Sequence, residues 1–147
     1  MFPQPAGKSS AGGSLDATGA GKTDPDAPRE PACMTFLIVD DNGEMRRLIR
    51  RTVTRKNDIV YECSDGSEAL ASYVQHGPDW VLMDIKMPRL DGISATVRIK
   101  EAFPEARIVV VSQYDDPEVR EGACRAGAAG YVLKDDLLAI LRIIGRT

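Results

Sequence analysis

The amino-acid sequence predicts an α/β domain in which helices cover both faces of a doubly wound parallel β-sheet. Short apolar runs alternate with amphipathic stretches from residue 35 to the end of the chain. Each run is continuously apolar rather than alternately apolar and polar, as expected for a parallel strand that is buried on both faces. The regular alternation of the two kinds of segment predicts five βα units over residues 34–147.

The predicted strands are the five apolar runs, Phe36–Val39, Ile59–Cys63, Trp80–Met83, Ile108–Val111 and Tyr131–Leu133. The predicted helices follow them at Met45–Val53, Ser67–Gln75, Ile93–Ala102, Pro117–Ala126 and Leu137–Ile144. The first helix carries Met45, Leu48 and Ile49 on one face, since they are spaced like successive turns of a helix. The fourth helix has a proline in its first turn and Gly127 just past its end, which are typical start and stop signals.

Residues 1–33 differ in composition from the rest of the chain. They contain five Gly, five Pro, six Ala and three Ser, and few large apolar residues. Such a segment cannot bury enough apolar surface to offset its loss of conformational entropy, so we expect a disordered, low-complexity tail. Its stretch Gly19–Thr23 resembles the end of a phosphate-binding loop, but position 16 holds Asp where that motif requires Gly. We therefore assign ordered structure to residues 34–147.

Composition and charge argue against several classes of protein. The net charge of −3 is unfavourable for non-specific nucleic-acid binding. No apolar run approaches the roughly 18 residues that a membrane span needs. The three cysteines are too widely spaced for a disulfide framework or a zinc site, and we expect Cys63 and Cys124 to be small core residues. The sequence thus predicts a cytoplasmic protein that neither crosses a membrane nor binds nucleic acid directly.

Polar side chains stand where the predicted strands end. Asp40 and Asp41 follow the first strand, Asp84 the third, Ser112 the fourth and Lys134 the fifth. In a doubly wound sheet these carboxyl ends meet at the edge where ligands bind. Three converging carboxylates would repel one another without a cation among them, and carboxylate oxygens suit Mg²⁺. Because a lysine and a hydroxyl can bind phosphoryl oxygens, the pattern predicts Mg²⁺-dependent phosphoryl transfer onto an aspartate.

Four motifs together resemble the receiver domain of bacterial two-component response regulators. They are Val39-Asp40-Asp41-Asn42, residues 83–92 (MDIKMPRLDG), Val111-Ser112 and Tyr131-Val132-Leu133-Lys134. The resemblance extends from Thr35 to about Ile144. Residues 112–117 and 126–131 are also similar to receivers of the NarL/FixJ type, whose usual output is a LuxR-type helix-turn-helix. The resemblance implies a flavodoxin-like (βα)5 fold with strand order 2-1-3-4-5.

The resemblance also implies a role for each matching residue of the site. Asp84 is expected to be the phosphoacceptor. Asp41 and Asp84 are expected to bind Mg²⁺ directly, together with the backbone carbonyl of Lys86, and Asp40 is expected to bind it mainly through a water molecule. Lys134 is expected to pair with a phosphoryl oxygen.

Two further residues are implied to carry the signal away from this site. Ser112 would hydrogen-bond a phosphoryl oxygen and shift towards it, and Tyr131 would then rotate inwards as a switch residue. The face built from the fourth helix, the fifth strand and the fifth helix would respond. The implied partners are a sensor histidine kinase or a phosphotransfer protein, and a homodimer partner or downstream output partner.

Two alternative functions are left open by the sequence. A degenerate receiver would act as a phosphorylation-independent interaction module, and the presence of every expected site residue argues against it. A haloacid-dehalogenase-like phosphatase needs Asp-x-Asp after the first strand, whereas Asn42 stands at the third place. Turnover would fail without that acid–base carboxylate, so we do not expect an enzyme. The sequence is compatible with a stand-alone receiver and with part of a longer regulator.

Overall fold

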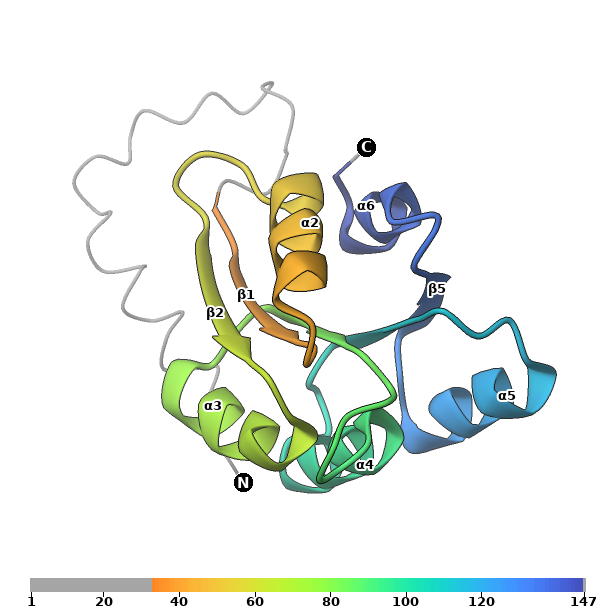
Figure 1. Cartoon of the computed structure of the whole chain (residues 1–147). Helices are drawn as coiled ribbons and strands as arrows, with labels where there is room; N and C mark the ends of the chain where they lie inside the picture. The colour runs from red at the N-terminus through yellow and green to blue at the C-terminus, as the bar shows by residue number, and fades with distance from the viewer. Residues whose placement is uncertain (1–32, 147) are drawn as a thin grey trace.

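Five parallel strands form a sheet in the order β2-β1-β3-β4-β5, which confirms the predicted flavodoxin-like topology (Figure 1). The strands are β1 (Thr35–Val39), β2 (Ile59–Cys63), β3 (Trp80–Met83), β4 (Ile108–Ser112) and β5 (Gly130–Leu133). The structure, a computed structural model, describes residues 33–146. The predicted tail, residues 1–33, therefore lies outside the described residues except for Cys33. Among the described residues, no helix combines the length and the apolar character that a membrane span requires.

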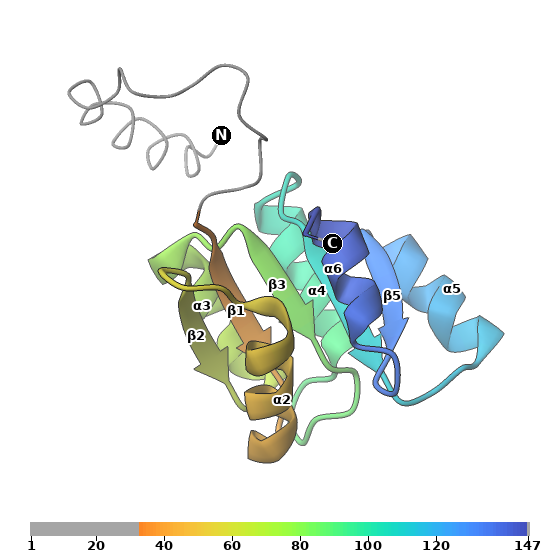
Figure 2. The ribbon, with the colours of Figure 1, turned by 90° about the horizontal axis from the view of Figure 1, so that it is seen from above.

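Helices cover both faces of this sheet, as two perpendicular views show (Figures 1 and 2). They are α2 (Gly43–Val53), α3 (Ala69–His76), α4 (Gly92–Ala102), α5 (Pro117–Ala126) and α6 (Leu138–Ile144). Helices α2 and α6 lie on one face, and α3, α4 and α5 lie on the other (Figure 1). The strand order reverses between β1 and β3. The carboxyl ends of these two strands are therefore the switch point at which open α/β sheets bind their ligands.

Alternate residues of the interior strand β1 contribute to the two hydrophobic cores. Phe36 and Ile38 pack in the cluster that includes residues of α2 and α6, while Leu37 and Val39 pack in the cluster that includes residues of α3 and α4. All four side chains are fully buried. Burying each of them stabilises the fold by about 1.5–3 kcal/mol. A slip of one residue would exchange the two packed faces, so the register of the site-bearing strand is fixed.

Two local details differ from the sequence expectations. The helix expected at Ser67–Gln75 begins as a 3₁₀ turn, Gly66–Glu68 (η2), which Asp65 caps by accepting a 2.8 Å hydrogen bond from the Ser67 backbone N–H. The prediction that Cys124 lies in the core is wrong, since its side chain is exposed. The neighbouring Ala123 is the buried residue on this part of α5.

A buried ion pair fastens the segment after α6 to the rest of the domain. The Arg146 guanidinium donates hydrogen bonds to both carboxylate oxygens of Asp58 and to the carbonyl of Val53. Asp58 also accepts hydrogen bonds from the backbone N–H groups of Met34 and Arg55. Burial opposes the ionisation of Asp58, but these hydrogen bonds outweigh it and lower the pKa of Asp58 to about 2. The pair thus joins the end of the domain to the start of β1 and to the loop before β2.

Replacing Asp58 by Ala should lower the free energy of unfolding by about 3–5 kcal/mol, because it leaves the buried Arg146 charge without its counter-ion. The folded pKa of Asp58 lies below its ordinary 3.8, so this stabilisation is complete above that pH and is lost as the pH falls to about 2. Urea denaturation of the parent and the variant at neutral and acid pH measures both effects. Glu121→Ala removes an exposed pair with Arg125 and should cost less than about 1 kcal/mol. Equal losses in the two variants would contradict the prediction.

Candidate functional site

Three carboxylates converge at the carboxyl ends of the neighbouring strands β1 and β3. Asp40 and Asp41 follow β1, and Asp84 follows β3. Because Val39 pairs with Met83 in the sheet, Asp40 and Asp84 leave neighbouring strands side by side. One oxygen from each of the three carboxylates lies within 4.8 Å of the others. The structure thus brings together all three predicted acidic residues. Asp40 and Asp84 are buried, and Asp41 is exposed.

The ammonium group of Lys134 lies between the two buried carboxylates. It is 3.1 Å from Asp40 Oδ2 and 3.1 Å from Asp84 Oδ1. Lys134 follows β5, and its backbone N–H donates a 2.8 Å hydrogen bond to the carbonyl of Ser112 at the end of β4. Burial disfavours the charge of Lys134, but the Asp84 and Asp40 carboxylates outweigh this effect and raise the pKa of Lys134. The lysine is therefore a fixed positive charge at the centre of the site.

The environment of Asp84 disfavours its negative charge. Burial is the main cause and the Asp40 carboxylate the second, and together they raise the pKa of Asp84 to about 6. Lys134 and a 2.8 Å hydrogen bond from the Ile85 backbone N–H act in the opposite direction. At neutral pH, Asp84 is thus an ionised carboxylate whose charge is only partly compensated. A further positive charge at this edge would relieve the imbalance.

The residues of this edge fit a divalent cation such as Mg²⁺. Asp40 Oδ2 is buried and has no hydrogen-bond partner, although the Lys134 ammonium lies beside it as a counter-ion. This one ammonium group serves both Asp40 and Asp84, and the net negative charge that remains is costly to bury unless a further cation offsets it. The other side of the cluster is open, because Asp41 is exposed. This suits an ion that prefers oxygen ligands and keeps several of its waters, and Asp40, Asp41 and Asp84 are the residues that would hold it.

The loop after β1 is fixed by its own polar groups. Asp40 Oδ1 accepts a 2.9 Å hydrogen bond from the Asn42 backbone N–H, and the Asp40 carbonyl accepts one of 2.6 Å from Arg46. Asn42 caps α2, since its side-chain oxygen accepts from the backbone N–H groups of Glu44 and Met45. Asn42 is therefore a helix cap, and the acid–base carboxylate that the phosphatase alternative needs is not at this position.

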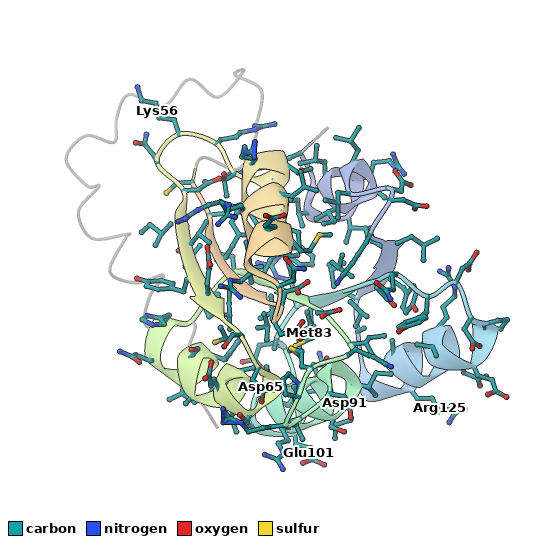
Figure 3. All side chains as sticks on the ribbon, in the orientation of Figure 1. Lys56, Asp65, Met83, Asp91, Glu101 and Arg125 are labelled. Carbon is teal, nitrogen blue, oxygen red and sulfur yellow. The ribbon has the colours of Figure 1, made fainter. Side chains whose placement is uncertain are left out.

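The loop after Asp84 depends on an aspartate and two glycines that the sequence analysis did not assign to the site. A β-carbon on Gly92 would lie 1.8 Å from the Asp84 carbonyl oxygen, and one on Gly66 would lie 2.3 Å from a carbonyl oxygen of the same loop. Asp65, labelled beyond the end of β2 in Figure 3, accepts a 2.8 Å hydrogen bond from the Arg89 backbone N–H. These contacts hold the loop against the site. Their signal in the sequence is two Asp-Gly pairs, which by themselves indicate only turns.

The other predicted residues meet around the loop between β4 and α5. The Ser112 hydroxyl is buried and accepts a 2.9 Å hydrogen bond from the Tyr114 backbone N–H. Tyr131, which is half-buried on β5, donates its hydroxyl to the Tyr114 carbonyl (2.7 Å). The ammonium group of Lys86 lies 5.6 Å from the centre of the Tyr114 ring. Ser112 is thus linked to Tyr131 through Tyr114, while the expected Mg²⁺ contact of the Lys86 carbonyl stays a prediction.

A doubly wound sheet with crowded carboxylates and a lysine at its switch point is typical of α/β domains that bind a cation and a phosphate group at that edge. Comparison with known proteins narrows this class. Residues 36–143 match the response regulator receiver domain. The chain belongs to this family, and the resemblance predicted from its motifs is confirmed.

Individual relatives agree with the family assignment. The chemotaxis protein CheY of Halobacterium salinarum is 41% identical over 98 residues, which cover 67% of this chain and 82% of CheY. A LuxR-family two-component response regulator from Aurantimonas sp. SI85-9A1 has a TM-score of 0.71 at 31% identity, covering 78% of this chain and 88% of that one. A chain of the CheX–CheY–BeF3–Mg²⁺ complex from Borrelia burgdorferi has a TM-score of 0.67 at 26% identity, covering 75% of this chain and 85% of that one.

Millimolar Mg²⁺ should raise the melting temperature of the protein, because an ion held by the three carboxylates of the folded state would offset their repulsion. At about ten times its Kd it would add about 1.4 kcal/mol to the free energy of unfolding, a shift of several degrees. Asp41→Ala should remove most of this response without destabilising the metal-free protein. Calorimetry with and without Mg²⁺ measures both effects. Glu101→Ala, on α4 (Figure 3), should respond like the parent. An unchanged parental melting temperature would rule out a competent site.

Proposed function

We propose that this chain is a phosphorelay receiver that accepts a phosphoryl group on Asp84 from a sensor histidine kinase or a phosphotransfer protein, with Mg²⁺ as cofactor. The main support is the state of Asp84, a buried carboxylate that lies 3.1 Å from a fixed ammonium group and has a raised pKa. Membership of the receiver family and the likeness to a CheY complex that contains Mg²⁺ also support the proposal. Residues 34–147 form the receiver domain in this proposal.

In the proposed transfer, an oxygen of Asp84 attacks the phosphorus of a phosphohistidine. An O–P bond forms, the donor's N–P bond breaks, and the departing imidazole nitrogen keeps the electron pair and takes up a proton. Asp84 Oδ1 already contacts the Ile85 N–H and Lys134. We therefore assign the attack to Oδ2, which makes neither contact. When Mg²⁺ is bound, it supplies positive charge for the phosphoryl oxygens.

Lys134 and Ser112 are the residues we propose to bind the transferred group. The Lys134 ammonium lies beside Asp84 before transfer, so it can pair with a phosphoryl oxygen after a small movement. The Ser112 hydroxyl accepts a hydrogen bond from Tyr114, which leaves its own proton to donate to a second phosphoryl oxygen. Each contact is charge-assisted once the phosphate is present.

The signal is proposed to leave through the face built from α5, β5 and α6. Tyr131 is the proposed switch residue on this face and would rotate inwards when Ser112 moves towards the phosphate. The face would then bind a second copy of the chain or a downstream output partner. A LuxR-family regulator among the similar structures supports an output of that kind in a longer protein.

Incubation with Mg²⁺ and phosphoramidate should add one phosphoryl group, which hydroxylamine should release because an acyl phosphate is a mixed anhydride. Asp84→Asn should abolish this adduct and keep the fold, since the two side chains are nearly isosteric. Intact-mass measurement follows both. Asp91→Asn is the matched control, because Asp91 caps α4 through the Ser94 backbone N–H and Asn caps helices equally well. An undiminished adduct in Asp84→Asn would refute the assignment. A parent that takes up no phosphate would favour the phosphorylation-independent module.

Tyr114→Ala should shorten the lifetime of the phosphorylated protein by about two- to tenfold, which corresponds to about 0.4–1.4 kcal/mol of barrier. Hydrolysis needs a water in line with the bond between Asp84 and phosphorus. We expect that path to pass the Lys86 and Tyr114 side chains, which contact each other. The rate of phosphorylation by phosphoramidate should change less. Loss of the adduct is followed by mass after removal of the donor, with the exposed neighbour Gln113→Ala as control. Loss at the parental rate, or more slowly, would show that Tyr114 does not shield the site.

A further inference from the structure

The ring of Tyr131 is in contact with an arginine from α5. The guanidinium carbon of Arg120 lies 4.5 Å from the centre of the Tyr131 ring. The same guanidinium pairs with Asp115, in the loop before α5, at 3.1 Å. This ion pair is exposed and adds little stability by itself. The Arg120 guanidinium thus contacts both the Asp115 carboxylate and the Tyr131 ring.

Small side chains border the ring next to this contact. A cavity of about 210 Å³ adjoins Tyr131 and is lined by Arg120, Ala123, Cys124 and residues 128–130. Tyr131 is only half-buried, so dense packing does not fix its orientation. The ring–guanidinium contact and the hydrogen bond from the Tyr131 hydroxyl to the Tyr114 carbonyl therefore have a large share in holding it.

The hydrogen bond of Tyr131 also connects it to the phosphoacceptor edge. The carbonyl of Tyr114 accepts from Tyr131, and the N–H of Tyr114 donates to the Ser112 hydroxyl. One residue of the β4–α5 loop thus carries both contacts. A change in the orientation of Tyr131 therefore alters the restraint on the loop beside Ser112, and a movement of Ser112 acts on Tyr131 in return.

We propose that Arg120 is a positioning residue that holds Tyr131 in this orientation and so resists rearrangement of the β4–α5 loop when Asp84 is phosphorylated. The inference rests on the proposed function of Asp84. A cation–π contact that exists in one orientation alone stabilises that orientation selectively. Its removal favours the other orientations and makes entry of the phosphoryl group easier. At a partly exposed site, such a contact changes the equilibrium constant between this orientation of Tyr131 and the others by about two- to fivefold.

Arg120→Met tests the inference, because it keeps a long unbranched side chain and removes the charge. The initial rate of phosphorylation by phosphoramidate with Mg²⁺ should rise about two- to fivefold. In the unphosphorylated protein labelled with 3-fluorotyrosine, the ¹⁹F resonance of Tyr131 should shift, its assignment being made with Tyr131→Phe. Arg125→Met is the matched control, since Arg125 lies on the same helix, points away from the sheet (Figure 3) and pairs with Glu121 at 3.2 Å. This control should change neither quantity.

A second background separates positioning from a general effect of charge. In a Tyr131→Ala protein, Arg120→Met should no longer accelerate phosphorylation. Acceleration of the same size in that background would overturn the inference, as would an unchanged Tyr131 resonance or an equal effect of Arg125→Met. A parent that takes up no phosphate would overturn the proposed function and the kinetic part of the inference with it. The ¹⁹F comparison would then separately decide whether Arg120 sets the orientation of Tyr131.

Discussion

The arrangement of this domain depends on the balance of charge among Asp40, Asp84 and Lys134. Two carboxylates are buried side by side, and one ammonium group lies 3.1 Å from an oxygen of each. At an effective dielectric constant of about 20, unit charges about 4 Å apart interact by about 4 kcal/mol. The lysine therefore makes burial of the pair tolerable, but it cannot neutralise both members. The remaining imbalance is visible in the raised pKa of Asp84.

The topology of the sheet places these charges together. β1 and β3 are neighbours in space although β2 lies between them in the chain, so their carboxyl ends bring Asp40 beside Asp84. Lys134 reaches the same point from β5 because its backbone is hydrogen-bonded to the end of β4. Gly92 then lets the following helix begin against the Asp84 carbonyl. Strands that are packed on both faces hold all of these groups within narrow limits, which a charge cluster of this kind requires.

The strands and the acidic cluster could be predicted from the sequence because both follow from local patterns. Continuous apolar runs mark buried parallel strands, and the polar residue that ends each run must lie at the ligand-binding edge. Long-range pairs leave no such pattern: Arg146 and Asp58 are 88 residues apart, and nothing near either residue indicates the other. The prediction that Cys124 is a core residue was also wrong, since a small residue such as cysteine fits the exposed face of a helix as well as the buried one. The link between Ser112 and Tyr131 runs through the backbone N–H and carbonyl of Tyr114. Almost every residue has these groups, so the sequence does not indicate this link.

The charge cluster is connected to the rest of the domain in different ways at the ends of β1 and β4. On the side of β1, Asp40 is bonded to the cap of α2, where Asn42 accepts two hydrogen bonds from the helix and Arg46 binds the Asp40 carbonyl. On the side of β4, Ser112 is joined to Tyr131 by single hydrogen bonds through a loop. A new negative charge on Asp84 would draw on Lys134 and Ser112, and both are attached to the end of β4. We expect the β4–α5 loop to follow Ser112, because the Tyr114 N–H is bonded to the Ser112 hydroxyl, whereas among the described residues no hydrogen bond ties the cap of α2 to Ser112 or Lys134. The direction of the proposed signal, towards β5 and α5, thus follows from the attachment of both phosphate-binding residues to the end of β4.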